Sequence, residues 1–394
     1  MDKNKEKRVV SGMRTTGHMH LGHYHSVLKN WLVLQERYKC FFFAADLHAM
    51  TTHYEHALNI EKNTFKMLKE WISVGIDPDK SCIFVQSFLS EHSELHLLLS
   101  MITPVNWLNR TPSYKDKNNK SVKNYGFLGY PVLQSSDILL YNPDYVPIGE
   151  DQVSHIEITR KISRRFNLTF GEHTSVYDNI SNIRRVLDKE ELIRFLRLIK
   201  KYKNSNCLAS LNDCKNIIIN SVMKKKKGCI SNFLSRKKIL KEPKVLLGKY
   251  PKIIGLDGRK MSKSYNNTIG LVEPQHRIHK KILQMPTDPA RIRISDPGNP
   301  EKCPVWNFHL LYSNESEKLW IKSGCKSASI GCIDCKKDLS NKIDIEHSPI
   351  RDNYNSINFS RKYVEKIIQE GKIEARKIAD KTLHNVKEAI NFLL

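Results

Sequence analysis

Two short segments, far apart in the chain, carry side chains suited to binding a polyphosphate. Residues 16–25 are TGHMHLGHYH and residues 260–264 are KMSKS. The first segment lies where a strand-like run at Val9 and Val10 gives way to a helix-like pattern. At such a junction glycine lets a phosphate approach the backbone closely, and the helix N-terminus offers N–H groups to bind it. The second offers two cations and two hydroxyls. Either alone could be a solvated loop, but both suit the same ligand, and together they predict an ATP-binding enzyme.

The composition restricts the classes of protein to be considered. The chain has 394 residues, enough for two or three domains, and 40% of them are hydrophobic, which excludes a disordered chain. It has 65 Lys and Arg against 41 Asp and Glu, and this net charge of +24 favours a polyanionic partner such as nucleic acid, or an anionic membrane surface. A general abundance of lysine contributes to the excess, so charge alone supports RNA binding only weakly.

The hydrophobic pattern indicates a protein without a membrane segment. No apolar run approaches the roughly 18 residues needed to span a bilayer. Residues 1–8 are charged and are not followed by the apolar segment of a secretory signal. We therefore expect a soluble cytoplasmic protein, in which the nine cysteines are thiols or metal ligands rather than disulfides.

Strand-like and helix-like patterns alternate from residue 9 to about residue 185. Short apolar runs that resemble buried parallel strands occur at 41–45, 82–85 and 145–148, and helical spacing occurs at 58–71, 94–102 and 151–166. This alternation predicts an α/β fold with a doubly wound, Rossmann-like parallel sheet and ligands at the carboxyl ends of the strands. The polar stretch 111–123 is interpreted as a mobile loop within an insertion.

The pattern changes in the second half of the chain. Residues 186–242 are rich in lysine and keep a helical spacing, which predicts a basic helical insertion whose lysine run at 224–227 is a solvated face. Residues 243–270 are predicted to return to the first domain, which spans 1–185, and to carry the KMSKS segment. Residues 271–394 are predicted to be helical, with helices at 277–283, 310–320 and 359–394.

Several segments resemble one known family. His20-Leu21-Gly22-His23 and residues 260–264 resemble the HIGH and KMSKS motifs of class I aminoacyl-tRNA synthetases. Residues 130–141 (YPVLQSSDILLY), 146–152 (VPIGEDQ) and 285–291 (MPTDPAR) are similar to the bacterial tryptophanyl-tRNA synthetases, and the resemblance runs from about residue 9 to the C-terminus.

The resemblance implies an activity and its partners. It implies a tryptophan–tRNA ligase that converts L-tryptophan and ATP, with Mg²⁺, into tryptophanyl-adenylate and pyrophosphate. The amino acid is then transferred to tRNA(Trp). It also implies a homodimer, and a tRNA-binding role for residues 271–394.

The resemblance assigns residues to the ATP site. His20, His23, Lys260 and Lys263 are implied to be catalytic, because they contact the phosphates and stabilise the charge that grows on them. Gly149 and Asp151 match a turn that binds the ribose. The full ATP-binding set is Arg14, Thr15, Thr16, Gly22, His23, Gly149, Glu150, Asp151, Lys260, Met261, Ser262, Lys263 and Ser264.

The tryptophan site is assigned in the same way to Tyr130, Gln134, Asp137 and Gln152. Asp137 is implied to accept the indole N–H, while Tyr130 and Gln152 match positions that hold the substrate's ammonium group. The chemistry is consistent, because indole is only a donor, and a phenylalanine competitor would leave the buried acceptor unpaired at a cost of about 1–3 kcal/mol. The apolar run at 138–140 indicates that Asp137 points inward.

Four late cysteines lie within one short window. Cys303, Cys325, Cys332 and Cys335 are separated by 21, 6 and 2 residues. A four-cysteine site holds either Zn²⁺ or a [4Fe–4S] cluster, and the spacing does not choose between them. Some tryptophanyl-tRNA synthetases carry an iron–sulfur cluster at such cysteines, and resemblance to that subgroup favours [4Fe–4S], with zinc as the alternative. Its role would be structural or RNA-facing.

Two other functions remain open from the sequence. A tyrosyl-tRNA synthetase shares the fold and both ATP motifs, but binds a phenol. A non-catalytic RNA-binding relative would use the basic surface and the cysteine site alone. The intact phosphate ligands His20, His23, Lys260 and Lys263 favour an enzyme over that second alternative.

Overall fold

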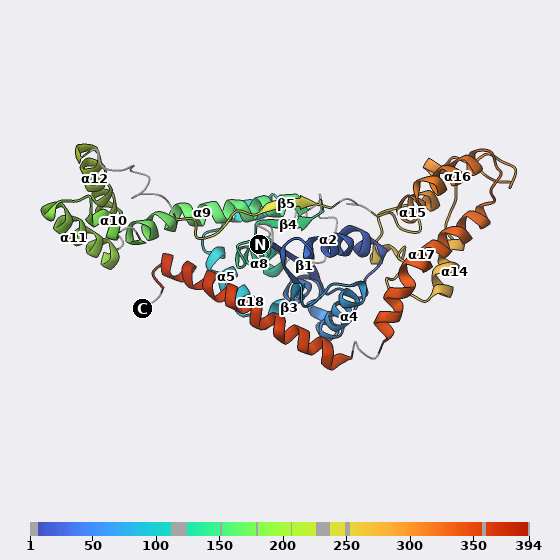
Figure 1. Ribbon diagram of the computed structural model, residues 1–394, viewed down its shortest axis with the longest axis horizontal. Helices are drawn as coiled ribbons and strands as arrows, with labels where there is room; N and C mark the ends of the chain where they lie inside the picture. Colours follow the sequence, from blue (N-terminus) through green and yellow to red (C-terminus); the bar gives the residue numbers. More distant parts are fainter. Residues whose placement is uncertain are drawn as a thin grey trace.

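A five-stranded parallel sheet forms the centre of the chain (Figure 1). The computed structural model describes residues 7–111, 124–149, 152–178, 180–205, 207–225, 237–248, 253–356 and 360–392. The strands are β1 Arg8–Arg14, β2 Lys39–Ala45, β3 Ser81–Val85, β4 Tyr145–Ile148 and β5 Lys244–Leu247, in the order β3-β2-β1-β4-β5. All neighbours pair in parallel, which confirms the predicted α/β fold. The order reverses at β1 and β4, and ligands bind at such a switch point in open α/β sheets.

Helices cover both faces of the sheet, so its strands are buried on two sides. Along β2, Phe41 and Phe43 pack into one hydrophobic core, whereas Phe42 packs into the other. Burial on both faces explains why the strands are continuous apolar runs. The surrounding helices are α1 Leu21–His23, the π-helix η1 Tyr24–Leu28, α2 Lys29–Gln35, α3 Asp46–His53, α4 Leu58–Val74, α5 Glu91–Ser100, α6 Val105–Asn109, α8 Tyr125–Leu139 and α9 Val153–Asp178. Most of the predicted loop 111–123 lies outside the described residues.

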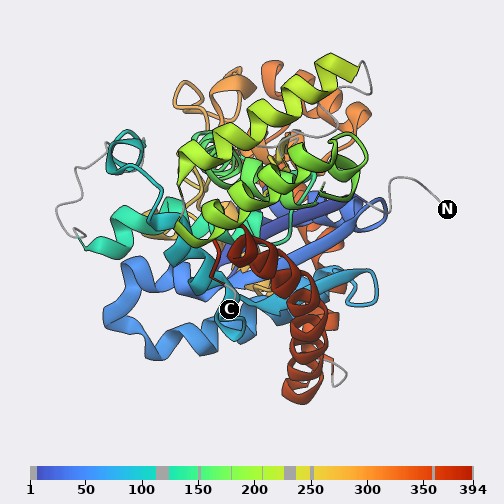
Figure 2. The same ribbon diagram turned by 90° about the vertical axis from the view of Figure 1, so that its left-hand side faces the viewer.

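A helical lobe with its own core lies at one end of the molecule. It consists of α10 Ile180–Arg184, α11 Lys189–Ser205 and α12 Leu208–Lys225, and it faces the viewer in Figure 2. Phe195, Ile199 and Ile218 are buried between these helices and belong to a core cluster separate from the two around the sheet. Helices α11 and α12 lie within the predicted insertion 186–242, whereas α10 lies before it, and residues 226–236 lie outside the described residues.

The opposite end of the molecule is helical as well (Figure 1). Its elements are α14 Gln275–Leu283, α15 Pro304–Tyr312, α16 Glu315–Lys326 and α17 Cys332–Asn355. The 3-10 turn η5 Lys263–Tyr265 precedes them in the chain and lies beside the segment that follows β1. The prediction of one helix over 310–320 is wrong, because the chain breaks at Ser313 and Asn314. The Asn314 side chain accepts from the Glu317 N–H at 2.9 Å and the Glu317 carboxylate accepts from the Asn314 N–H at 2.8 Å, a capping box that starts a new helix.

The last helix, α18 Arg361–Ala389, runs back along the sheet and packs on β3 (Figure 1). Gly371 lies directly against the edge strand: a Cβ built there would be 1.9 Å from the Ile83 carbonyl oxygen. The Cys82 thiol donates to the Gly371 carbonyl at 3.2 Å. The absent side chain therefore allows the two backbones to touch. Across the described part of the chain, no helix has both the length and the apolar character needed to cross a membrane.

Gly371→Ala is expected to lower the free energy of unfolding by about 1–3 kcal/mol, because the new methyl group must push α18 away from β3. This loss outweighs the gain of about 1 kcal/mol in helix propensity that alanine brings. Urea unfolding measures the difference. Gln369→Ala, at an exposed position two residues earlier in the same helix, is the control and should stay within about 0.5 kcal/mol. A Gly371→Ala protein as stable as the parent would contradict the close packing.

Candidate active site

A cavity of about 440 Å³ opens at the carboxyl ends of β1 and β4, where the strand order reverses. It is bordered by four parts of the chain: the segment after β1 with the helices that follow it, the end of β4 with the turn after it, the residues after β5, and the KMSKS segment. The lining includes Thr16, His20, Gly22, His23, Pro147, Ile148, Gly149, Gln152, Gly248, Lys260, Met261, Ser262 and Lys263. The fold therefore places the two segments identified from the sequence on a single cavity.

Direct contacts join the two segments. The Lys263 ammonium donates to the Thr16 carbonyl at 3.1 Å, and the Gly22 N–H points at the Met261 sulfur at 3.3 Å. A Cβ at Gly22 would be 2.8 Å from Nδ1 of His20 and 3.5 Å from the Met261 sulfur. A side chain at Gly22 would therefore crowd His20 of the same segment, whereas its distance to Met261 would be an ordinary van der Waals contact. Partial desolvation lowers the pKa of Lys263.

The rings of the two histidines of the first segment lie against each other in a tilted arrangement. The His20 and His23 rings lie 3.8 Å apart, and Nδ1 of His23 accepts from the His20 N–H at 3.2 Å. Burial, assisted by the Lys263 charge, lowers the pKa of His20 to about 4, and burial together with both neighbours lowers the pKa of His23 well below its usual value. Both imidazoles are therefore neutral near pH 7 and can offer a ligand an N–H group but no positive charge.

A buried carboxylate, not identified from the sequence, supports this loop. Glu70 on α4 is fully buried, and its Oε2 accepts from the Met19 N–H at 3.1 Å. Its charge acts on Lys263 and favours the protonated ammonium. The sequence did contain a signal for this role. Glu70 stands between Leu68 and Trp71 on the apolar face of a helix, where a buried carboxylate needs hydrogen-bond or charge partners.

Asp137, on α8, is 1% exposed and sits in a network of donors. Its Oδ1 pairs with Nε2 of Gln86 and Nδ1 of His92, both at 2.7 Å, and its Oδ2 pairs with Nε2 of His48 at 2.8 Å. Burial alone would raise the pKa of Asp137, but the hydrogen bonds and charges of His48 and His92 lower it below its usual range. The carboxylate is thus held ionised inside the protein, at the inward position expected from the sequence.

The sequence prediction missed His48, Gln86 and His92. His48 lies on α3 immediately after β2, and Gln86 and His92 follow β3. The carboxyl ends of parallel strands lie at one edge of the sheet. Polar residues that directly follow β2 and β3 in the sequence could therefore have been identified as neighbours of one site.

The remaining predicted residues of the tryptophan site connect to the same region. The Tyr130 hydroxyl pairs with Nε2 of His155 at 2.6 Å, and Nδ1 of His155 pairs with Oε1 of Gln152 at 2.9 Å. Gln152 lines the cavity, and the Tyr130 ring centroid lies 6.3 Å from that of His48. Gln134 is half-buried on α8, one helical turn before Asp137.

Three other predicted ATP ligands, Arg14, Thr15 and Ser264, are not among the residues that line the cavity. Arg14 ends β1 and donates to the Thr52 hydroxyl, and Thr15 is buried beside it. The Ser262 and Ser264 hydroxyls pair at 2.9 Å. Glu150 and Asp151 lie outside the described residues.

The four late cysteines gather at the far end of the helical region. Cys303 caps α15, Cys325 lies in α16, and Cys332 and Cys335 lie in the first turn of α17. Burial raises the pKa of Cys335 to about 12, and the other three thiols are close enough to raise it further. The Arg291 guanidinium lies 3.9 Å from the Cys325 sulfur.

Comparisons with known proteins agree with this architecture. A family model described as "tRNA synthetases class I (W and Y)" matches residues 2–196 and 218–347. A tryptophan–tRNA ligase from Ralstonia nicotianae is 43% identical over 392 residues and covers 98% of each chain, and one from Thermotoga maritima is 40% identical over 98% of this chain and 99% of its own. A crystal structure of tryptophanyl-tRNA synthetase from Campylobacter jejuni, complexed with ADP and tryptophan, has a TM-score of 0.74 at 27% identity, over 98% and 99% of the two chains.

A parallel sheet with these two segments at its switch point has the fold of the class I aminoacyl-tRNA synthetases. The match extends over most of the sequence. The chain belongs to the tryptophan and tyrosine group of that class, and the two relatives above are both tryptophan–tRNA ligases.

Proposed function

We infer that the chain activates L-tryptophan with ATP and transfers it to tRNA(Trp). The function is supported by the cavity that both nucleotide-binding segments border, together with the buried, ionised Asp137. The tryptophan–tRNA ligases that are 40–43% identical over nearly the whole chain favour tryptophan over tyrosine.

In the activation step, the tryptophan carboxylate attacks the α-phosphorus of ATP, the bond to the bridging oxygen breaks, and pyrophosphate leaves with its electron pair. Lys260 and Lys263 neutralise the triphosphate, while neutral His20 and His23 donate hydrogen bonds to it. Gly149 permits the nucleotide to approach the turn after β4. Mg²⁺ accompanies ATP without needing a dedicated protein cage. The residues thus act by positioning and by electrostatic stabilisation.

The tryptophan side chain binds beside Asp137. The carboxylate already accepts hydrogen bonds from Gln86, His48 and His92, so the indole N–H either shares an oxygen with one of these donors or replaces it. His48 is the better candidate for release, because its side chain is 10% exposed whereas that of His92 is fully buried. Tyr130 and Gln152 hold the ammonium group. In the second step, a terminal ribose hydroxyl of the tRNA attacks the activated carbonyl carbon and AMP leaves.

Amino-acid-dependent exchange of pyrophosphate into ATP tests the function. With each of the twenty amino acids in turn, exchange is expected for tryptophan alone. Exchange with tyrosine in its place would identify a tyrosyl-tRNA synthetase, and no exchange with any amino acid would indicate a non-catalytic relative.

We also propose that Cys303, Cys325, Cys332 and Cys335 hold a [4Fe–4S] cluster. The four thiols interact electrostatically with one another, which puts them at one site. The Arg291 cation beside Cys325 offsets part of the charge that four thiolates would carry. Four thiolates can hold either Zn²⁺ or a [4Fe–4S] cluster, and the resemblance to the synthetases that carry an iron–sulfur cluster favours the cluster.

Protein purified without oxygen is expected to be brown, with visible absorbance that is lost on exposure to air. Cys332→Ser should remove the colour, whereas Cys214→Ser, which alters a buried thiol in the α11–α12 lobe, should keep it. Iron and zinc analysis accompanies the spectra. A colourless preparation with one zinc ion per chain would reject the iron–sulfur assignment.

The remaining proposals concern assembly and domain organisation. We propose that the enzyme is a cytoplasmic homodimer, a state supported by the exposed apolar side chains of Leu97 (55%), Met101 (73%) and Val105 (58%) on and after α5. Light scattering coupled to size exclusion measures the oligomeric state, and a monomeric mass would refute the dimer.

We also propose that residues 271–394 bind tRNA and that 186–242 form a separate insertion.

A further inference from the structure

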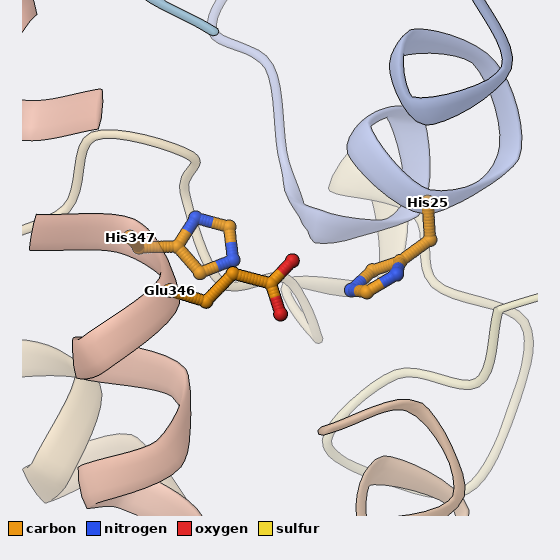
Figure 3. A group of neighbouring side chains, drawn as sticks. All are labelled: His25, Glu346 and His347. Atoms are coloured by element: carbon orange, nitrogen blue, oxygen red, sulfur yellow. The ribbon is translucent and has the colours of Figure 1, made fainter. Parts of the chain in front are cut away.

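A second group of metal-ligating side chains lies away from the cysteines and beside the cavity. It combines His25, on the π-helix η1, with Glu346 and His347, on α17. One ligand atom from each residue lies within 4.8 Å of the other two. Figure 3 shows the Glu346 carboxylate between the two imidazole rings. We propose that these three residues bind a divalent transition-metal ion, with Zn²⁺ as the best match.

The chemistry of the donors fits such an ion. Two imidazoles and one carboxylate suit zinc and its neighbours, and three protein ligands leave a fourth tetrahedral position for water. His25 is 3% exposed and His347 is fully buried. Burial favours the neutral imidazole, which is the form that binds metal ions.

Neighbouring groups orient these ligands and also oppose the metal. The Tyr312 hydroxyl pairs with Nε2 of His347 at 2.9 Å. The Lys29 ammonium lies 2.7 Å from Oε1 of Glu346 and balances its charge. A bound cation would share the carboxylate with Lys29, so the lysine should weaken binding through repulsion between like charges. The affinity for zinc should therefore rise when Lys29 is removed and fall when Glu346 is removed.

The positions of the three ligands in the fold indicate what a bound metal ion would do to the structure. η1 begins directly after His23 of the nucleotide-binding segment, and α17 begins at the cysteine cluster. π-helical turns are rare and frequently occur at functional sites. A metal bridging His25 and His347 would fasten the catalytic helix to the C-terminal helical region, which adds a structural link beyond the proposed ligase activity.

Zn²⁺ binding to the full chain, measured by competition with a chromophoric chelator, tests the proposal. We expect one zinc ion per chain in addition to any metal at the cysteines. Glu346→Gln should weaken its binding at least about tenfold, since even partners of metal ligands contribute 10–100-fold. Lys29→Gln should tighten it, and Glu370→Gln, an equal charge change on exposed α18, should leave it unchanged.

Two further measurements distinguish metal bound by His25, Glu346 and His347 from metal bound at the cysteine site. Co²⁺ substitution should give visible bands without the near-ultraviolet thiolate absorption of a cysteine site, and those bands should persist in Cys332→Ser. Zn²⁺ should raise the thermal midpoint of the parent and not that of Glu346→Gln, whose fold is verified by circular dichroism. Unchanged zinc affinity in Glu346→Gln, or no zinc beyond the cysteine site, would overturn the proposal whatever the ligase activity.

Discussion

Replacing Lys263 with alanine should lower the rate of adenylate formation by about 100- to 1,000-fold, the effect of removing one preorganised group that stabilises transition-state charge. The Lys263 ammonium touches the Thr16 carbonyl across the cavity and lies over Gly17, where a built Cβ would be 3.5 Å from Nζ. It is therefore positioned to meet the phosphates between the two segments. Affinity for tRNA should change little, because this contact faces the nucleotide.

Single-turnover adenylate formation and a filter-binding assay for tRNA measure the two effects separately. Lys280→Ala removes an exposed lysine on the following helix α14 and should leave the rate of adenylate formation unchanged. Lys263→Arg keeps the charge and should recover part of that rate. Full activity in Lys263→Ala would show that Lys263 does not act on the leaving group.

The site was predictable from sequence where chemistry and short-range spacing coincide. Gly22 with its flanking histidines, and Lys263 with its hydroxyl neighbours, are contiguous patterns, and one common ligand predicted that they meet. Asp137 was predicted to point inward because its neighbours are apolar. Its partners His48 and Gln86 are isolated polar residues after separate strands, and only the parallel register of β2 and β3 brings them together.

The features that were missed depend on local capping or on long-range packing. The break between α15 and α16 follows from Asn314 and Glu317, a capping box that a search for apolar spacing overlooked. The contact of Gly371 with Ile83 joins the C-terminal helix to the edge strand, and the pair formed by His25 and His347 spans most of the chain. No spacing rule links residues so far apart, because the tertiary fold alone sets their distance.

Asp137→Asn should raise the KM for tryptophan while leaving the KM for ATP nearly unchanged. The carboxamide keeps the shape of the side chain but presents an NH₂ group to donors such as Gln86 and His92, and it weakens the acceptor for indole. A buried polar group left without its partner costs about 1–3 kcal/mol, which corresponds to roughly 5- to 150-fold in KM. Discrimination against phenylalanine should fall in parallel, because the penalty for lacking an indole N–H is reduced.

A matched control distinguishes recognition of tryptophan from a general loss of stability. Asp144 precedes β4 at the opposite, amino-terminal edge of the sheet, where it accepts from the Arg8 N–H at 2.9 Å and pairs with Lys241 at 2.6 Å. Asp144→Asn should destabilise the fold without changing the KM for tryptophan. If both variants lose stability and neither shifts that KM, Asp137 is a structural carboxylate. If only Asp137→Asn shifts it, the carboxylate binds the substrate, because a merely structural change at either edge would affect tryptophan and ATP alike.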